Sequence, residues 1–252
     1  MESYATAQQV FAAGLVFARL GAIIMLLPGF GETFIPPRIR LAFALTMSLM
    51  LYPLVAGAAP PLPGSPGDMA AAVIKELLIG LMIGGVIRMF MSSLATAGEV
   101  VSLQTTLSFS QTANPTQAQP STTLGTFLGL MGIVLIMATD LHHLFIAAIV
   151  RSFTLFPFGR EVALADAAEM AVGTMGGSFA LGLQLAAPVI VFSLIFNIAT
   201  GLVGRVMPQF QVFFVATPLM LLMGLSVFAL SLGVIGMVWV DRYRDLIGTF
   251  AR

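Results

Sequence analysis

Residues 99–123 read EVVSLQTTLSFSQTANPTQAQPSTT and separate the two central apolar segments of the chain. After Glu99 this stretch carries no charge, and the next ionisable side chain is that of Asp140. Pro115 and Pro120 remove backbone donors and oppose a long helix. Polar, non-helical backbone at membrane depth is tolerated only where protein buries it or where it lines an aqueous path. Two interpretations stay open: a plain extracytoplasmic linker, or a re-entrant or plugging loop in a pore.

The composition is that of an integral membrane protein. Of the 252 residues, 58% are hydrophobic and 9% are charged, and the mean hydropathy is +1.01. Soluble domains have about a quarter of their residues charged. The net charge is zero and no basic run occurs, so we expect no nucleic-acid partner. The absence of cysteine excludes disulfides and thiolate metal sites. The N-terminus lacks the positive region of a cleaved signal peptide, so we expect the first apolar segment to be retained.

The apolar segments predict an all-α membrane protein with a single domain over residues 1–252. A membrane-crossing helix needs about 20 mostly apolar residues. The alternation of about ten residues that marks a membrane β-barrel is missing from the sequence. Six segments qualify as helices, packed as hairpins: 10–28, 41–59, 69–98, 124–150, 171–202 and 210–240.

Prolines and small residues give these segments an unusual character. Pro28 ends the first segment, and further prolines lie inside later ones, namely Pro53, Pro188 and Pro218. Neighbouring helices have to satisfy the backbone groups that such prolines leave unpaired. Small residues one helical turn apart let helices approach closely. They occur at Gly80 and Gly84, at Gly125 and Gly129, and at Ala18 and Ala22. We expect them to serve packing within the chain.

Arg19 lies in the middle of the first apolar segment. A lone arginine at the bilayer centre costs about 2.5–3.5 kcal/mol on insertion scales. We therefore expect Arg19 to face protein or water and to pair with a carboxylate such as Glu76 or Glu99. A structural pair is favoured over an ion pathway.

Residues 140–143 read DLHH and end an otherwise apolar run. A metal site needs three or four ligands and supporting groups, and the chain has no histidine other than His142 and His143. The expectation from sequence is therefore no metal site. A proton relay stays open because histidine titrates near neutrality, although an interfacial helix end explains the residues more simply. No catalytic constellation or phosphate loop is recognisable, so we expect neither an enzyme nor a cofactor.

Three stretches, in order, carry a resemblance to one family. Residues 19–40 read RLGAIIMLLPGFGETFIPPRIR, with an arginine, a proline–glycine–phenylalanine turn, Ile-Pro and a basic pair. Residues 97–115 hold AGE, QTTLSF and NP, followed by the two histidines and by RSFTLFPFG at 151–159. Residues 204–218 read GRVMPQFQVFFVATP. Together they resemble the FliR-type export-gate proteins of bacterial flagella and their counterparts in virulence type III secretion. Asn114 departs from the family's usual aspartate.

The resemblance implies a non-enzymatic subunit of a protein export gate in the bacterial inner membrane, at the flagellar basal body. It implies partners similar to FliP and FliQ in a helical assembly, with FlhB and FlhA nearby, and unfolded proteins as substrates. In the family, apparent spans need not be membrane crossings. Three alternatives stay open: an injectisome subunit, a proton-coupled transporter that uses Arg19, Glu99 or Asp140, and a purely structural nucleus for assembly.

The resemblance also implies that the mid-chain loop, at about 105–122, closes the channel. Apolar side chains can exclude ions by dewetting, and amides can hold the loop shut through weak hydrogen bonds of about 1 kcal/mol each. We assign residues 106–120 to this plug. Its candidates are Leu107, Phe109, Gln111, Asn114, Pro115, Gln117, Gln119 and Pro120. The candidates for subunit packing or buried polar contacts are Arg19, Pro36, Glu99, His142, Arg205, Pro208, Gln209 and Pro218.

Overall fold

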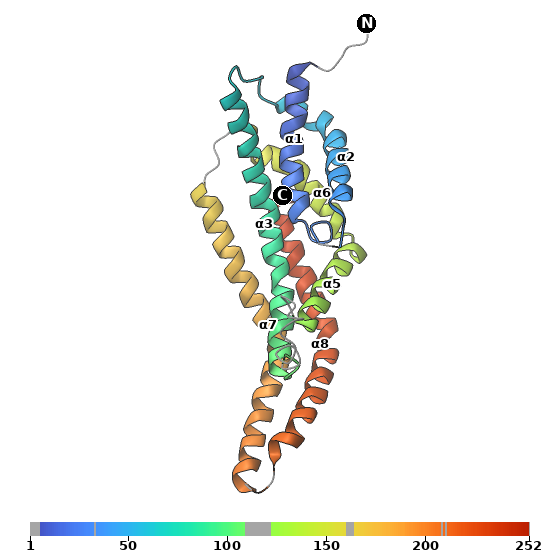
Figure 1. Cartoon of the computed structure of the whole chain (residues 1–252), viewed down its shortest axis with the longest axis vertical. Helices are drawn as coiled ribbons and strands as arrows, with labels where there is room; N and C mark the ends of the chain where they lie inside the picture. Colours follow the sequence, from blue (N-terminus) through green and yellow to red (C-terminus); the bar gives the residue numbers. More distant parts are fainter. Residues whose placement is uncertain are drawn as a thin grey trace. The chain divides into compact units, whose positions relative to one another are not determined.

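The computed structural model describes residues 6–32, 34–108, 122–159, 164–207, 209 and 211–251. These residues form seven α-helices and one 3-10 turn, with no strand among them (Figure 1). The elements are α1 (Ala7–Leu26), α2 (Pro37–Val55), η1 (Ala56–Ala58), α3 (Pro66–Gln104), α5 (Thr123–Ala138), α6 (Leu141–Leu155), α7 (Leu164–Val206) and α8 (Val212–Ala251). The predicted all-α class is confirmed.

Five helices are long and apolar enough to cross a membrane: α1, α2, α3, α7 and α8. The count rises to six if α5 and α6 together form one span. The prediction of one continuous helix over residues 124–150 was wrong. The chain bends at Thr139 and Asp140, where Asp140 adopts a left-handed backbone with φ 57°. The apolar run conceals this break because hydropathy reports side chains and not backbone angles.

Local sequence explains how α1 begins and ends. The Thr6 hydroxyl accepts a hydrogen bond from the Gln9 backbone, and the Gln9 side chain accepts one from the Thr6 backbone. This capping box satisfies two of the free donors at the helix start. Helix α1 ends at Leu26, before Pro28, and Gly29 then turns the chain with φ 88°. As expected, helices α2, α7 and α8 contain internal prolines, namely Pro53, Pro188 and Pro218.

By packing, the chain divides into two compact units. Unit 1 comprises Met1–Phe90, Thr139–Met175 and Arg244–Arg252, and unit 2 comprises Met91–Ala138 and Gly176–Tyr243. Helices α3, α7 and α8 contribute to both units. The single membrane domain expected over residues 1–252 stays a prediction.

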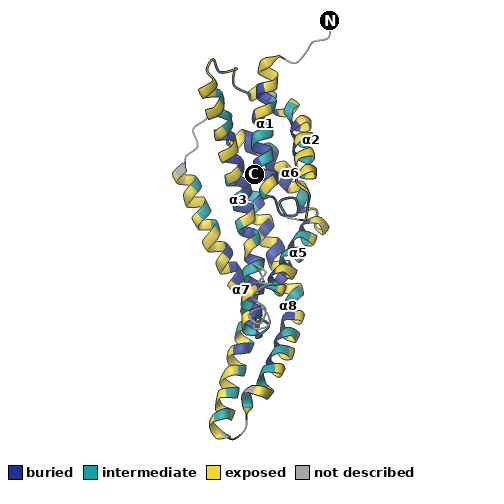
Figure 2. Ribbon diagram, viewed as in Figure 1, coloured by how far each residue is buried: buried dark blue, intermediate teal, exposed yellow. Residues whose placement is uncertain are grey.

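Helix α1 is the centre of unit 1. In an apolar stretch of 18 residues, 56% of α1 is buried, whereas the buried share is 22% for α2, which packs on α1 (Figure 2). Helix α3 presents Gly80 and Gly84 to α1. A Cβ at Gly80 would lie 2.5 Å from the Arg19 carbonyl oxygen, and one at Gly84 would lie 2.9 Å from Leu26 Cβ. Because glycine has no side chain, the backbones of α1 and α3 approach each other closely at Gly80 and Gly84. This glycine pair serves packing within the chain, as predicted.

The second half of α3 is the centre of unit 2, where α5, α7 and α8 contact it. A Cβ at Gly98 would fall on the backbone of Gly125 in α5, and one at Gly182 in α7 would lie 2.8 Å from the Ser93 carbonyl oxygen. From α8, Trp239 Nε1 donates a hydrogen bond of 3.2 Å to Ser93 Oγ. Of the second predicted glycine pair, Gly125 is tightly packed, but Gly129 has open space around it.

Within unit 2, α7 and α8 form a hairpin whose ends are joined by residues 207–211 (Figure 1). A Cβ at Gly224 of α8 would lie 3.8 Å from the Phe192 ring of α7. Helix α7 exceeds the predicted 171–202 at both ends, because a helix continues past its apolar run where propensity allows.

Candidate functional site

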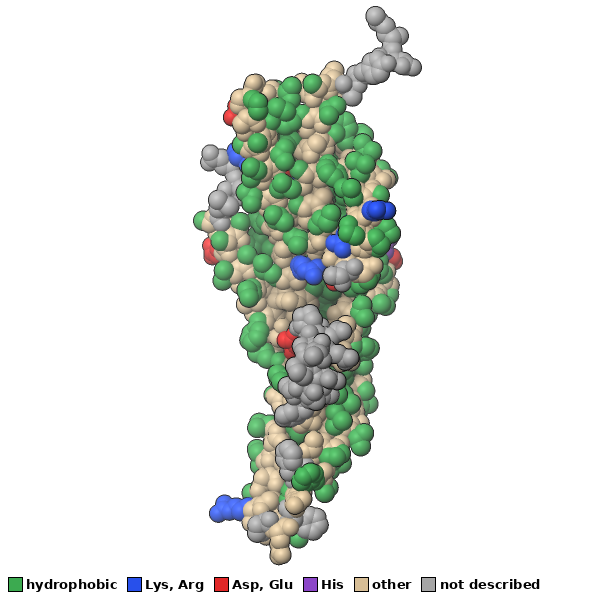
Figure 3. Space-filling model, viewed as in Figure 1, with side chains coloured by type: hydrophobic (Ala, Val, Ile, Leu, Met, Phe, Trp, Pro, Cys, Tyr) green, Lys and Arg blue, Asp and Glu red, His purple; other side chains and the backbone are tan. Residues whose placement is uncertain are grey.

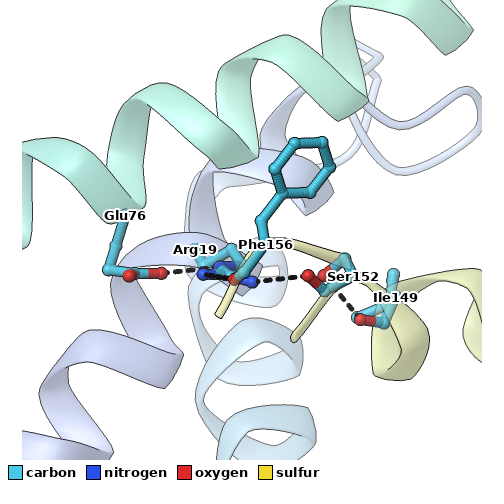
Figure 4. Close-up of polar contacts among 5 residues, drawn as sticks. All are labelled: Arg19, Glu76, Ile149, Ser152 and Phe156. Atoms are coloured by element: carbon cyan, nitrogen blue, oxygen red, sulfur yellow. Dashed lines mark hydrogen bonds and ion pairs between the residues drawn. The ribbon is translucent and has the colours of Figure 1, made fainter. Parts of the chain in front are cut away.

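A buried polar cluster around Arg19 lies inside unit 1. Helix α1 places the Arg19 side chain where none of it is exposed, and α3 brings Glu76, which is also buried. Arg19 Nε donates to Glu76 Oε2 at 2.6 Å (Figure 4). Sequence had left Glu76 and Glu99 as alternatives, and the structure selects Glu76. Glu99 is exposed on α3.

Helix α6 completes the cluster with backbone oxygens. Arg19 Nη1 donates to the Ser152 carbonyl at 2.9 Å, and Nη2 donates to the Phe156 carbonyl at 2.8 Å (Figure 4). Helix α6 ends at Leu155, and the Ser152 carbonyl already accepts a hydrogen bond of 2.9 Å from the Phe156 backbone N–H. Arg19 therefore adds a second donor to the Ser152 carbonyl and supplies one to the Phe156 carbonyl, just past the helix end. The guanidinium also lies 4.2 Å from the centre of the Phe153 ring and 5.3 Å from that of Phe158, within cation–π range.

This arrangement is a structural tie between three helices. Three of the five N–H groups of Arg19 are engaged with Glu76 and the two carbonyls, and the aromatic rings flank the guanidinium. Sequence reasoning missed the carbonyls and Phe153. One signal was present: Glu76, Gly80 and Gly84 recur every four residues on one face of α3, so the glycines that touch α1 also point Glu76 toward it.

In unit 2, hydrogen bonds and packing of uncharged side chains hold the C-terminal end of α3. Ser193 Oγ of α7 donates to Gln104 Oε1 at 2.7 Å. The buried Thr105 hydroxyl donates to the Val101 carbonyl, and its methyl group occupies the space beside Gly224. Thr106 then takes a left-handed backbone with φ 63°. These contacts thus hold the residues at which the chain leaves α3 and the non-helical part of the mid-chain stretch begins.

Of the eight predicted plug residues, the structure describes one. Leu107 is half-buried directly after α3. The others lie outside the described residues: Phe109, Gln111, Asn114, Pro115, Gln117, Gln119 and Pro120.

The residues predicted for subunit packing differ in their exposure. His142 is half-buried at the start of α6. Pro208 lies outside the described residues. Exposed in the isolated chain are Pro36, Arg205, Gln209 and Pro218.

Three side chains at the break between α5 and α6 come together in unit 1. Asp140, His142 and His143 each offer a ligand atom, and these atoms lie within 4.8 Å of one another. Asp140 Oδ1 is 3.7 Å from His143 Nδ1, and the two imidazole rings have their centres 4.1 Å apart. The Nδ1 atom of His142 is buried and has no hydrogen-bond partner among the described residues.

Large apolar side chains are exposed along α7 and α8. Figure 3 shows hydrophobic side chains over much of one face, with few charged side chains between them. Near the α7–α8 turn, the exposed fraction is 79% for Val206 and 63% for Val215. In the middle of α8, it is 86% for Leu230. Apolar surface of this extent is stable against lipid or against other apolar chains.

Comparison with known proteins places the chain in a family. The family model described as "Bacterial export proteins, family 1" matches residues 10–246. The chain is 61% identical over 250 residues to the flagellar biosynthetic protein FliR of Caulobacter vibrioides, with 99% of this chain and all of that protein covered. It belongs to the FliR family of bacterial export proteins.

Other members of the FliR family are more distant but match over most of their length. The chain is 30% identical to FliR of Pectobacterium carotovorum, with 87% of this chain and 83% of that protein covered. It is 29% identical to FliR of Escherichia coli, with 92% and 88% covered. The family predicted from the three sequence stretches is confirmed.

Proposed function

We propose that this protein is a non-enzymatic subunit of the flagellar protein export gate in the bacterial inner membrane. The observation that carries the proposal is the match to flagellar biosynthetic proteins over nearly the whole chain. The helices that are apolar enough to cross a membrane agree with this role. These relatives are flagellar biosynthetic proteins, which favours the flagellar system over the injectisome.

In this proposal the chain assembles with FliP- and FliQ-like subunits, and FlhB- and FlhA-like proteins adjoin the gate. The exposed apolar surface of α7 and α8 supports such an assembly, because other apolar helices can cover it. The exposed positions of Arg205 and Gln209 at the α7–α8 turn leave their side chains accessible to neighbouring subunits.

The mid-chain loop, residues 106–120, closes the channel in this proposal. Substrates of every charge have to pass, and a loop without fixed charge neither traps nor repels them. The contacts of Gln104 and Thr105 support the assignment, because they hold the start of the loop in unit 2 while the residues beyond supply the closure. Opening is then a local change that leaves the helices in place.

The proton-coupled transporter gains little support from the site. Arg19 is engaged with a carboxylate, two carbonyls and aromatic rings, which is the pattern of a structural pair. Glu99 is exposed and distant in sequence from that cluster. A transporter would also have to work as this chain alone.

The first experiment is the native mass and composition of the tagged protein, extracted from its own host in mild detergent. The proposal expects a large complex that contains FliP- and FliQ-like chains. A monomer or homodimer without these partners contradicts the proposal and favours the proton-coupled transporter.

The second experiment tests the loop in assembled gates. Deleting residues 110–119 is expected to raise ion leak across the membrane, measured as dissipation of the membrane potential in cells. Co-purification of the partner chains with the deletion variant shows that the gate still forms, and wild-type protein at matched expression gives the baseline. An unchanged leak in assembled gates removes the plug assignment.

A further inference from the structure

The cluster of Asp140, His142 and His143 has polar groups that the fold itself does not use. Asp140 stands at the N-cap position of α6, yet its side chain makes no capping hydrogen bond. Its distance of 3.7 Å from His143 Nδ1 is longer than a hydrogen bond. Buried polar atoms are normally hydrogen-bonded, and His142 Nδ1 finds no partner in the described part of the chain. These three side chains therefore have no evident structural role in common.

The same distances suit coordination of a metal ion. Two imidazole nitrogens and one carboxylate oxygen are the donors of three-ligand zinc sites with an open fourth position. With bonds of about 2.0–2.1 Å, tetrahedral ligand atoms lie about 3.4 Å apart. The separation of 3.7 Å is close to this value, and the ligand atoms all lie within 4.8 Å before any adjustment.

The side chains have room to make that adjustment. The exposed fraction of the side chain is 78% for Asp140 and 70% for His143, so both can rotate without disturbing packed neighbours. His142 is half-buried and holds one donor in place. All three residues fall within four consecutive positions of unit 1, so local backbone geometry alone brings them together.

We propose that Asp140, His142 and His143 bind a divalent transition-metal ion of the zinc type. The sequence had disfavoured a metal because two histidines alone are too few. The αL backbone at Asp140 and the helix that follows it bring a third ligand to the pair. Imidazole with carboxylate selects zinc-like ions over magnesium and calcium, which prefer oxygen ligands alone. The site is independent of the export function proposed above.

The test is a Co²⁺ titration of the full-length protein in detergent, carried on a tag that contains no histidine. The chain has two histidines and no cysteine, so a visible Co²⁺ spectrum of near-tetrahedral type with nitrogen ligands has to come from this site. We expect one Co²⁺ per chain, displaced by Zn²⁺. Absence of the visible bands overturns the proposal.

Variants assign the ligands. Asp140→Asn and His143→Gln are each expected to weaken Co²⁺ binding at least about 10-fold, because loss of a ligand costs no less than loss of a supporting group. Asp166→Asn is the matched control, since Asp166 is an exposed carboxylate in the first turn of α7. Equal affinity in wild-type protein and in Asp140→Asn overturns the site as drawn.

A measurement on the wild-type protein removes the dependence on variant folding. In protein labelled with ¹⁵N at histidine, Co²⁺ is expected to broaden or shift the imidazole signals of both residues at one equivalent. Signals that stay unchanged at that ratio contradict the proposal.

Discussion

The two units of this protein bury polar groups in different ways. Unit 1 buries a full charge pair, Arg19 with Glu76, that joins α1, α3 and the end of α6. In unit 2, the buried polar side chains among the described residues are serine and threonine hydroxyls, beside the aromatic Trp239 and Tyr243. A buried ion pair stabilises only while both partners are present, whereas neutral contacts contribute in small, separable steps. We therefore expect the loss of one polar partner to cost more stability in unit 1 than in unit 2.

Removing one charge from unit 1 is expected to have the largest effect. Glu76→Leu leaves Arg19 buried without its carboxylate, which costs about 3–5 kcal/mol of unfolding free energy. The measurement is thermal unfolding in detergent, followed by far-ultraviolet circular dichroism.

The double variant Arg19→Met with Glu76→Leu is its control. It is expected to recover part of that loss, since no charge stays buried, although the carbonyls of Ser152 and Phe156 each lose the hydrogen bond from Arg19. A double variant no more stable than Glu76→Leu contradicts the ion-pair account.

The tightest contact of unit 2 gives the next effect. Gly98→Ala places a methyl group against the backbone of Gly125 and is expected to cost about 1–3 kcal/mol by overpacking. Gly129→Ala is the control on α5, where the space is open and the change favours the helix. Fluorescence of the single tryptophan, the buried Trp239, reports unfolding of this unit. Equal destabilisation by both changes contradicts the close approach of α3 and α5.

A single neutral hydrogen bond in unit 2 gives a smaller effect. Ser193→Ala removes the donor to Gln104 and is expected to cost about 0.5–1.5 kcal/mol. Ser226→Ala is the control, because the exposed Ser226 hydroxyl donates to the Leu222 carbonyl, one turn earlier in its own helix. The measurement is again Trp239 fluorescence during thermal unfolding. If Ser193→Ala costs as much stability as Glu76→Leu, the proposed difference between the two units is wrong.

The smallest effect is expected at the start of the mid-chain stretch. A left-handed backbone costs a β-branched residue about 1–2 kcal/mol, and glycine relieves this while adding about 0.5–1 kcal/mol of entropy to the unfolded chain. Thr106→Gly is therefore expected to stabilise unit 2 by less than about 1 kcal/mol. Thr106→Val keeps the strain and serves as the control in the same fluorescence assay. A marked loss on Thr106→Gly means that the threonine side chain itself holds the α3 end.

The sequence by itself determined the membrane class, most helices, the end of the first helix near Pro28 and the need of Arg19 for a carboxylate. These follow from local physics: apolar runs, missing backbone donors and the cost of a lone charge in lipid. The FliR-family membership was also visible, because it rests on residues and their order.

Tertiary structure decided which carboxylate pairs with Arg19. Glu76 and Glu99 both lie on α3, and the choice depends on the level at which α1 meets that helix, which the contacts at Gly80 and Gly84 set. The sequence also did not predict the helix break at Asp140, or that the Asp140 side chain lies close to two histidines. Residue type restricts backbone angles and long-range contacts only loosely, and packing then selects among what residue type allows.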